Sequence, residues 1–203
     1  TYALYRLGEQ RETPGQDADL SSDFRSGQAW MSAEALRERW GWYNYLQKRW
    51  RIISSVEATK GEVLTYQGKP IFAAYHSTSG GETQDSGEYF NELAYLRGVP
   101  SPGEEGSPYY QTSKYVSWQE VASLLNIDIP TESLLDLTAL FCITEHYPTG
   151  RVKTVEALGH SFTGRQIREK LGLRSNWFTV ATSSDGVLFE TKGNGHGVGM
   201  SQY

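Results

Sequence analysis

The sequence has a single cysteine, so no disulfide can form within the chain. Cys142 lies in the apolar run Leu140–Ile143, which is typical of a buried, unreactive thiol. On a strand, Cys142 and His146 would share one face, but no second pair of ligands completes a tetrahedral zinc site. We therefore expect no metal and no other cofactor.

The sequence also lacks a signal peptide and any run of about 20 apolar residues, the length that a membrane-spanning helix needs. Its net charge of −5 argues against nucleic acid as a partner. The chain begins at Thr1 without a methionine and stops at Tyr203 inside a glycine-rich loop. We interpret it as a section cut from a longer protein.

What the sequence does contain is typical of a folded globular protein, with 38% hydrophobic and 21% charged residues. Aromatic residues are abundant, with 13 Tyr and 6 Trp. Such side chains either stack on sugars or peptides, or simply fill the core, and composition leaves both interpretations open.

Helix and strand patterns alternate, and the strands are linked mostly by hairpin turns, which predicts an α+β fold with mainly antiparallel sheets. Capping residues and apolar spacing predict helices at 33–40, 45–60, 117–125 and 163–170. Alternation and turn residues predict strands at 62–66, 69–76, 137–147, 151–158, 177–182 and 187–191. A lobe boundary is expected near 100–115, which is compatible with two lobes around a groove.

Two loops rich in glycine and hydroxyl residues stand out. Tyr75–Gly81 follows Pro70–Ala74, an apolar run that predicts a buried strand, and Gly193–Gln202 closes the chain. Loops at strand ends present hydrogen-bonding groups to ligands. We expect the two loops to face each other as walls of a groove that segment 82–112 completes. The alternative is that they brace each other away from any ligand.

Residues in and near these loops are compatible with three kinds of chemistry. Ser77, Ser79 and Ser201 could pair with His76 or His196 in a hydrolase, but the nucleophile-elbow pattern is missing and turn hydroxyls usually satisfy backbone groups. A carboxylic acid could cleave a glycosidic bond, and the candidates are Glu57, Glu82, Asp85 and Glu88, each of which is otherwise a surface residue. Backbone amides of 193–197 could bind an anion, yet no phosphate-loop fingerprint is present.

Several motifs follow one another in an order typical of a known family. The clearest are YHSTSGGET at 75–83, YLRGVPSP at 95–102, FTGRQIR at 162–168 with LGLRS at 171–175, and GHGVGMSQY at 195–203. QAW at 28–30 and EATKGEVL at 57–64 also fit. Together they resemble the SpoIID/LytB family, the stage II sporulation protein D group, and the resemblance covers 1–203 as one domain.

The resemblance implies a lytic transglycosylase that acts on peptidoglycan glycan strands, preferring strands stripped of stem peptides. Such an enzyme cleaves between N-acetylmuramic acid and N-acetylglucosamine and leaves a 1,6-anhydro end. The family's catalytic glutamate is expected before Thr1, so no residue of 1–203 is named as the acid. The alternative is a non-catalytic glycan-binding module that stimulates or recruits a cell-wall amidase of the SpoIIP type. Either protein would be extracytoplasmic and anchored through a segment outside these residues.

Carried onto this sequence, the resemblance implies that Tyr95 and Arg97 form an aromatic and basic pair in a glycan groove. Their alternative roles are ordinary packing and a surface charge. The other implied glycan contacts are Tyr75, His76, Ser77, Thr78, Ser79, Gly80, His196, Ser201 and Gln202. Some clostridial-type relatives bind zinc before the QAW motif, but Ser21, Ser26 and Gly27 supply no ligand here.

Overall fold

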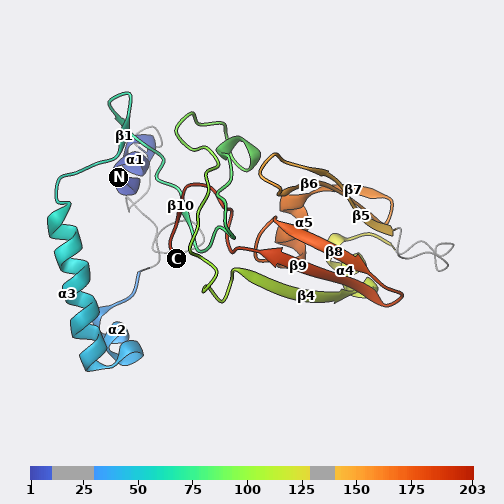
Figure 1. Cartoon of the computed structure of the whole chain (residues 1–203), viewed down its shortest axis with the longest axis horizontal. Helices are drawn as coiled ribbons and strands as arrows, with labels where there is room; N and C mark the ends of the chain where they lie inside the picture. The colour runs from blue at the N-terminus through green and yellow to red at the C-terminus, as the bar shows by residue number, and fades with distance from the viewer. Residues whose placement is uncertain (11–29, 129–139) are drawn as a thin grey trace. The chain divides into compact units, whose positions relative to one another are not determined.

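The computed structural model describes residues 1–10, 30–128 and 140–203 (Figure 1). Packing divides the chain into two units, Thr1–Ala73 and Ala74–Tyr203. Helices and mainly antiparallel sheets confirm the predicted α+β fold. The lobe boundary expected near 100–115 lies inside the second unit, and the groove between lobes stays a prediction. The QAW motif and the segment considered for zinc fall partly or wholly in 11–29, outside the described residues.

The first unit is mainly helical, with α1 (Tyr2–Gln10), α2 (Ala33–Trp40) and α3 (Trp42–Ala58). Helix α2 begins where predicted because the Ser32 hydroxyl accepts a hydrogen bond from the Ala35 amide. Helix α3 begins three residues earlier than predicted, directly after the Gly41 break. The apolar side chains that predicted this helix, including Leu46 and Trp50, are exposed. Among the described helices, none has the length and apolar content to span a bilayer.

The hairpin after α3 is much shorter than the predicted strands 62–66 and 69–76. Only β1 (Thr65–Tyr66) and β2 (Lys69–Pro70) pair, with one further hydrogen bond from the Ile71 amide to the Leu64 carbonyl. The predicted buried strand at 70–74 is therefore wrong. The chain passes from one unit to the other at Ala73, so the residues after Ile71 find no partner strand in this hairpin.

The second unit holds two three-stranded antiparallel sheets (Figure 1). One has the order β4-β9-β8 and the other β5-β6-β7. The strands are β4 (Gln111–Ser117), β8 (Phe178–Thr182), β9 (Gly186–Lys192), β5 (Phe141–His146), β6 (Val152–Ala157) and β7 (His160–Thr163). The predicted hairpins β5–β6 and β8–β9 are confirmed.

Two capped helices complete this unit, α4 (Trp118–Leu125) and α5 (Gly164–Leu171). Both predicted capping boxes are present, Ser117 with Glu120 and Thr163 with Gln166. Both sheets and both helices contribute to one buried core, whose members include Val121, Phe141, Val155, Ile167, Leu171, Phe178 and Phe189. Helix α5 approaches β6 so closely that a Cβ on Gly164 would lie 2.1 Å from the Val152 carbonyl oxygen.

Two strands and one side chain differ from the sequence-based expectations. Strand β4 was not predicted because its residues are mostly polar, and β7 is a short strand that follows a two-residue turn. Cys142 is exposed, so its predicted burial is wrong. Side chains alternate along β5, and Phe141 takes the core-facing position while Cys142 lies opposite Glu156.

Candidate functional site

The two glycine- and hydroxyl-rich loops lie side by side because their backbones pair. Strand β3 (Tyr75–His76) is parallel to β10 (Met200–Ser201), with His76 opposite Ser201. Beyond this pair, Thr78 and Asn194 exchange two backbone hydrogen bonds of 3.1 and 2.8 Å. The Gln84 amide then donates to the Gly197 carbonyl at 2.7 Å. The described backbone therefore joins residues 75–84 to residues 194–202, and we call this assembly the loop platform.

A buried carboxylate anchors the first loop of the platform. Glu104 is 3% exposed, and its Oε2 accepts hydrogen bonds from the Ser79 amide (2.7 Å), the Ser79 hydroxyl (2.9 Å) and the Gly80 amide (3.2 Å). Its Oε1 accepts from the Ser101 hydroxyl at 2.7 Å. Burial acts to raise the pKa of Glu104, but the hydroxyls of Ser201, Ser101 and Ser79 and the Ser79 amide together hold it below its ordinary value.

Glu104 is therefore an ionised acceptor at neutral pH, unsuited to donating a proton to a leaving group. It was not among the carboxylates singled out in the sequence. Glu104 and Glu105 are adjacent in a proline- and glycine-rich loop, and no local pattern distinguishes the buried one from its exposed neighbour.

A buried arginine anchors the platform from the other side. Arg151 is 1% exposed, and its Nη2 donates to the carbonyls of Ser79 at 3.2 Å and Glu82 at 2.6 Å. The guanidinium also lies over the Trp177 ring, 4.8 Å from its centroid. Burial lowers the pKa of Arg151 to about 10, against the opposing charges of Glu88 and Glu82, so the group is still cationic at neutral pH.

The second loop packs directly on this guanidinium through a glycine. Gly197 has a φ of 78°, and a Cβ there would lie 2.8 Å from Arg151 Nη2. Arg151 Nε and Nη1 are buried and make no hydrogen bond within the described part of the chain. The arginine thus contacts both loops, and only glycine fits at the contact.

Two histidines bracket the backbone of Val198. His76 Nδ1 donates to the Val198 carbonyl at 3.1 Å, and His196 Nδ1 accepts from the Val198 amide at 3.0 Å. The His196 ring also packs against Tyr89 and Phe90, with centroids 5.6 and 5.0 Å away. Burial lowers the pKa of His76, and burial together with the positive neighbours His76 and Arg168 lowers the pKa of His196 to about 4.

The described contacts do not assemble a serine hydrolase. Ser79 donates to Glu104, Ser77 lies 3.5 Å from the Thr78 hydroxyl, and neither histidine ring is within hydrogen-bonding geometry of a serine hydroxyl among the described residues. A Ser–His pair within 2.6–3.2 Å is what nucleophile activation requires. Ser79 therefore serves the hydrogen bonding of the platform.

Three of the four candidate carboxylates, those of Asp85, Glu88 and Glu57, also have structural contacts. Asp85 accepts from the Gly98 amide at 3.3 Å, and Glu88 accepts from the Thr149 hydroxyl at 2.6 Å. Glu82 contributes its backbone carbonyl to Arg151, and Glu57 in the first unit is exposed beside Lys60. Among the residues described, no group of three or more His, Cys, Asp or Glu side chains is arranged to hold a metal.

The structure brings most predicted glycan contacts onto the platform but buries several of them. His76, Thr78, Ser79 and Gly80 are buried, whereas Tyr75, Ser77, His196 and Ser201 are half-buried and the Gln202 side chain is exposed. Arg97 is exposed and pairs with Asp85 and Glu92 at 3.4 and 3.0 Å, and Tyr95 is half-buried. Contact of these residues with glycan stays a prediction.

Comparison with known proteins follows the same motifs. The chain is 36% identical over 185 residues to stage II sporulation protein D of Bacillus amyloliquefaciens, and equally to that of Bacillus subtilis. Each alignment covers 91% of this chain. The chain is SpoIID-like, as its motifs predict. An uncharacterized protein of Brachyspira hyodysenteriae is 28% identical over the whole chain, and no family model matches.

The SpoIID-like chain spans about half the length of the curated relatives it matches, 52% of each Bacillus protein and 51% of the Brachyspira protein. The alignment at 36% identity covers 91% of this chain. The unaligned remainder is too short to contain both segments of the platform, so at least part of the platform is aligned. The two Bacillus relatives are named for a stage of sporulation, and that name describes no chemistry.

Replacing Glu104 by Gln should destabilise the SpoIID-like chain by about 2–4 kcal/mol. The four hydrogen-bond donors around the carboxylate lose a charged acceptor, and the new amide NH₂ group would face some of these donors. Denaturant unfolding would measure the loss. Glu105→Gln, at the exposed neighbouring position, is the control and should change stability by less than about 0.5 kcal/mol. Equal effects of the two substitutions would contradict the anchoring role.

Replacing Gly197 by Ala should cost more than replacing Gly159 by Ala. Both residues have a positive φ, 78° and 81°, so each pays a backbone cost of about 1–2 kcal/mol. Only Gly197 also faces Arg151, whereas a Cβ on Gly159 meets nothing within 4 Å. We expect a difference of about 2 kcal/mol in unfolding free energy. If the two variants were equally stable, the packing of Gly197 on Arg151 would not contribute to the free energy of unfolding, which would contradict this prediction.

The free energy of unfolding should fall as pH falls from about 6.5 toward 4. The unfolded chain protonates His196 near its ordinary pKa of about 6.5, whereas the folded chain does so only near pH 4. Protons therefore favour the unfolded state in this window, by on the order of 2 kcal/mol for His196. Thermal unfolding from pH 7.5 to 4.5 would measure the slope. His196→Gln should flatten it, and an unchanged slope would refute the assignment.

Proposed function

We propose that the protein acts on the bacterial cell wall, as a lytic transglycosylase that cleaves peptidoglycan glycan strands. The observation that carries the proposal is the 36% identity to stage II sporulation protein D over 185 residues. The reaction itself follows from the motifs at 75–83, 95–102 and 195–203, which resemble those of the SpoIID/LytB family.

The chemistry of the platform supports a carbohydrate ligand. Its accessible groups include a neutral histidine and hydroxyls, and two neighbouring rings pack against His196, with Tyr89 half-buried and Phe90 38% exposed. Sugar rings bind by stacking on such faces and by hydrogen bonds to neutral polar groups. The charged groups Glu104 and Arg151 are buried below, so they shape the surface without meeting the ligand.

Cleavage needs a carboxylic acid held at a raised pKa. The pKa values displaced among the described carboxylates, those of Glu34, Glu104, Glu120 and Glu145, are all displaced downward. The resemblance to the SpoIID/LytB family implies that this acid is a glutamate before Thr1, and we adopt that assignment as part of the proposal. This acid protonates the leaving oxygen of N-acetylglucosamine as the glycosidic bond breaks. The 6-hydroxyl of N-acetylmuramic acid then attacks C1 and returns a proton to the same carboxylate.

The second candidate function is a glycan-binding module that recruits a cell-wall amidase of the SpoIIP type. It is favoured by Glu104, because this carboxylate has a lowered pKa and is fully engaged by hydrogen bonds, so it can shape a sugar-binding surface but is unsuited to act as the acid. In this case the groove residues bind peptidoglycan and the partner performs the hydrolysis.

Muropeptide analysis separates the two functions. Denuded glycan strands are incubated with a protein extended upstream of Thr1 to include the expected glutamate, and with the same protein carrying that glutamate as glutamine. We expect 1,6-anhydro ends from the first and none from the second. Absence of anhydro product from both, with strands still retained and amidase turnover raised, would replace the enzyme by the recruiting module.

A further inference from the structure

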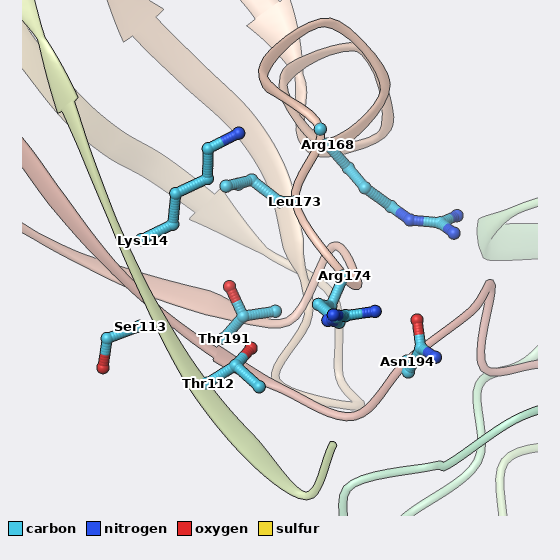
Figure 2. Close-up of a pocket in the computed structure, with 9 residues that line it drawn as sticks. Thr112, Ser113, Lys114, Arg168, Leu173, Arg174, Thr191 and Asn194 are labelled. Atoms are coloured by element: carbon cyan, nitrogen blue, oxygen red, sulfur yellow. The ribbon is translucent and has the colours of Figure 1, made fainter. Parts of the chain in front are cut away.

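A second site lies in a pocket at one edge of the β4-β9-β8 sheet, separate from the buried charges of the platform. Its volume is about 540 Å³, within the ~300–1,000 Å³ range of small-molecule sites. Figure 2 shows the lining side chains, which come from β4, from α5 with the turn after it, and from the end of β9. They are Thr112, Ser113, Lys114, Arg168, Leu173, Arg174, Thr191 and Asn194, with Gly172.

The pocket has an uncharged floor and a cationic rim. Thr191 and Leu173 are 2% and 7% exposed and form the floor. Thr112 lies opposite Thr191 in the β4–β9 register, so both hydroxyls belong to neighbouring positions of the same sheet. Lys114 and Arg174 are exposed and Arg168 is half-buried, and none of the described residues that line the pocket is acidic.

Each of the three cations contacts a neutral partner. Lys114 Nζ donates to the Leu171 carbonyl at the end of α5 (2.6 Å), and Arg168 Nη1 donates to the Tyr89 hydroxyl (2.7 Å). Arg174 lies 4.4 Å from the centroid of the Tyr109 ring.

These contacts orient the three side chains without neutralising their charges. Within the described ranges, none of the three cations forms an ion pair. The charge of Lys114 helps to lower the pKa of Glu120 through space, but the Glu120 carboxylate forms its hydrogen bonds with the Ser117 amide and hydroxyl. The chain as a whole carries a net charge of −5. Three unpaired cations around one pocket of an acidic protein indicate a site for an anion.

The pocket is continuous with the loop platform through Asn194. This residue lines the pocket and also exchanges two backbone hydrogen bonds with Thr78. A polymer lying on the platform can therefore extend one anionic substituent into the pocket. Arginine forks are suited to carboxylate and phosphate oxygens, and the threonine hydroxyls and the Asn194 amide can bind the remaining polar groups.

We propose that this pocket is an anion subsite that binds the carboxylate or phosphate of a cell-wall carbohydrate through Arg174, Arg168 and Lys114. The identity of the carbohydrate rests on the proposed function, whereas the preference for an anion rests on the pocket alone. The subsite should bind sugars that carry a free negative charge more tightly than neutral sugars with the same ring structure.

Titration of the 203-residue chain with three sugars, followed by backbone NMR shifts at low ionic strength, tests the proposal. The probes are N-acetylmuramic acid, with a free carboxylate, N-acetylglucosamine 1-phosphate, and neutral N-acetylglucosamine. At least one anionic sugar should bind about tenfold more tightly than the neutral one and shift the amides of Thr112, Thr191 and Asn194. Whether the carboxylate or the phosphate probe binds better tells which group the pocket takes.

Arg174→Gln and, separately, Lys114→Gln should each remove most of the preference for the anionic sugar. Lys170→Gln is the matched control, because Lys170 is an exposed cation on α5 that does not line the pocket. Unchanged unfolding temperatures would show that the variants are folded. Equal affinity for charged and neutral sugars, or equal effects of Arg174→Gln and Lys170→Gln, would overturn the proposal.

The outcome is independent of the cleavage assay. Anion-dependent binding without any anhydro product from glycan strands would retain the subsite and reject the enzyme. Anhydro product with no charge preference in the titration would retain the enzyme and reject the subsite.

Discussion

The arrangement of the candidate site depends on the buried guanidinium of Arg151. A cation in the interior is costly unless fixed partners surround it, and here the partners are two carbonyls of one loop, an aromatic face and a glycine of the other loop. Neither loop has regular structure beyond a two-residue strand, so neither could hold its shape alone. The guanidinium gives both loops a common point of contact, and Glu104 gives the first loop a second one.

This organisation separates structural charge from accessible surface. Glu104 and Arg151 are almost completely buried, whereas the two histidines of the platform are neutral at physiological pH. A ligand that meets the platform therefore encounters hydroxyls, a neutral imidazole and the half-buried Glu82, but neither of the two buried charges. Cations gather instead at the neighbouring pocket, on side chains held by neutral contacts. A polymer with uncharged rings and occasional anionic substituents would fit the loop platform and the neighbouring cationic pocket.

Local signals predicted the second unit well. Capping boxes at Ser117 and Thr163 and tight turns are decided within a few residues, so α4, α5 and two hairpins follow from sequence. The strand at 70–74 was wrong because apolar content alone says nothing about whether a partner strand exists. Arg151 and Glu104 were missed for a related reason. Their roles depend on burial and on partners 72 and 25 residues away, which no local pattern encodes.

The pairing of β3 with β10 has a consequence for how the protein forms. Hairpins such as β5–β6 can close while the chain is short, but the hydrogen bond from His76 to Val198 joins residues 122 positions apart. Closing so long a loop costs entropy that only the completed contacts repay. The platform is therefore expected to form late, after the sheets and helices of the second unit. During synthesis, a nascent chain whose residues 194–202 have not yet left the ribosome would carry a folded core and an unassembled platform.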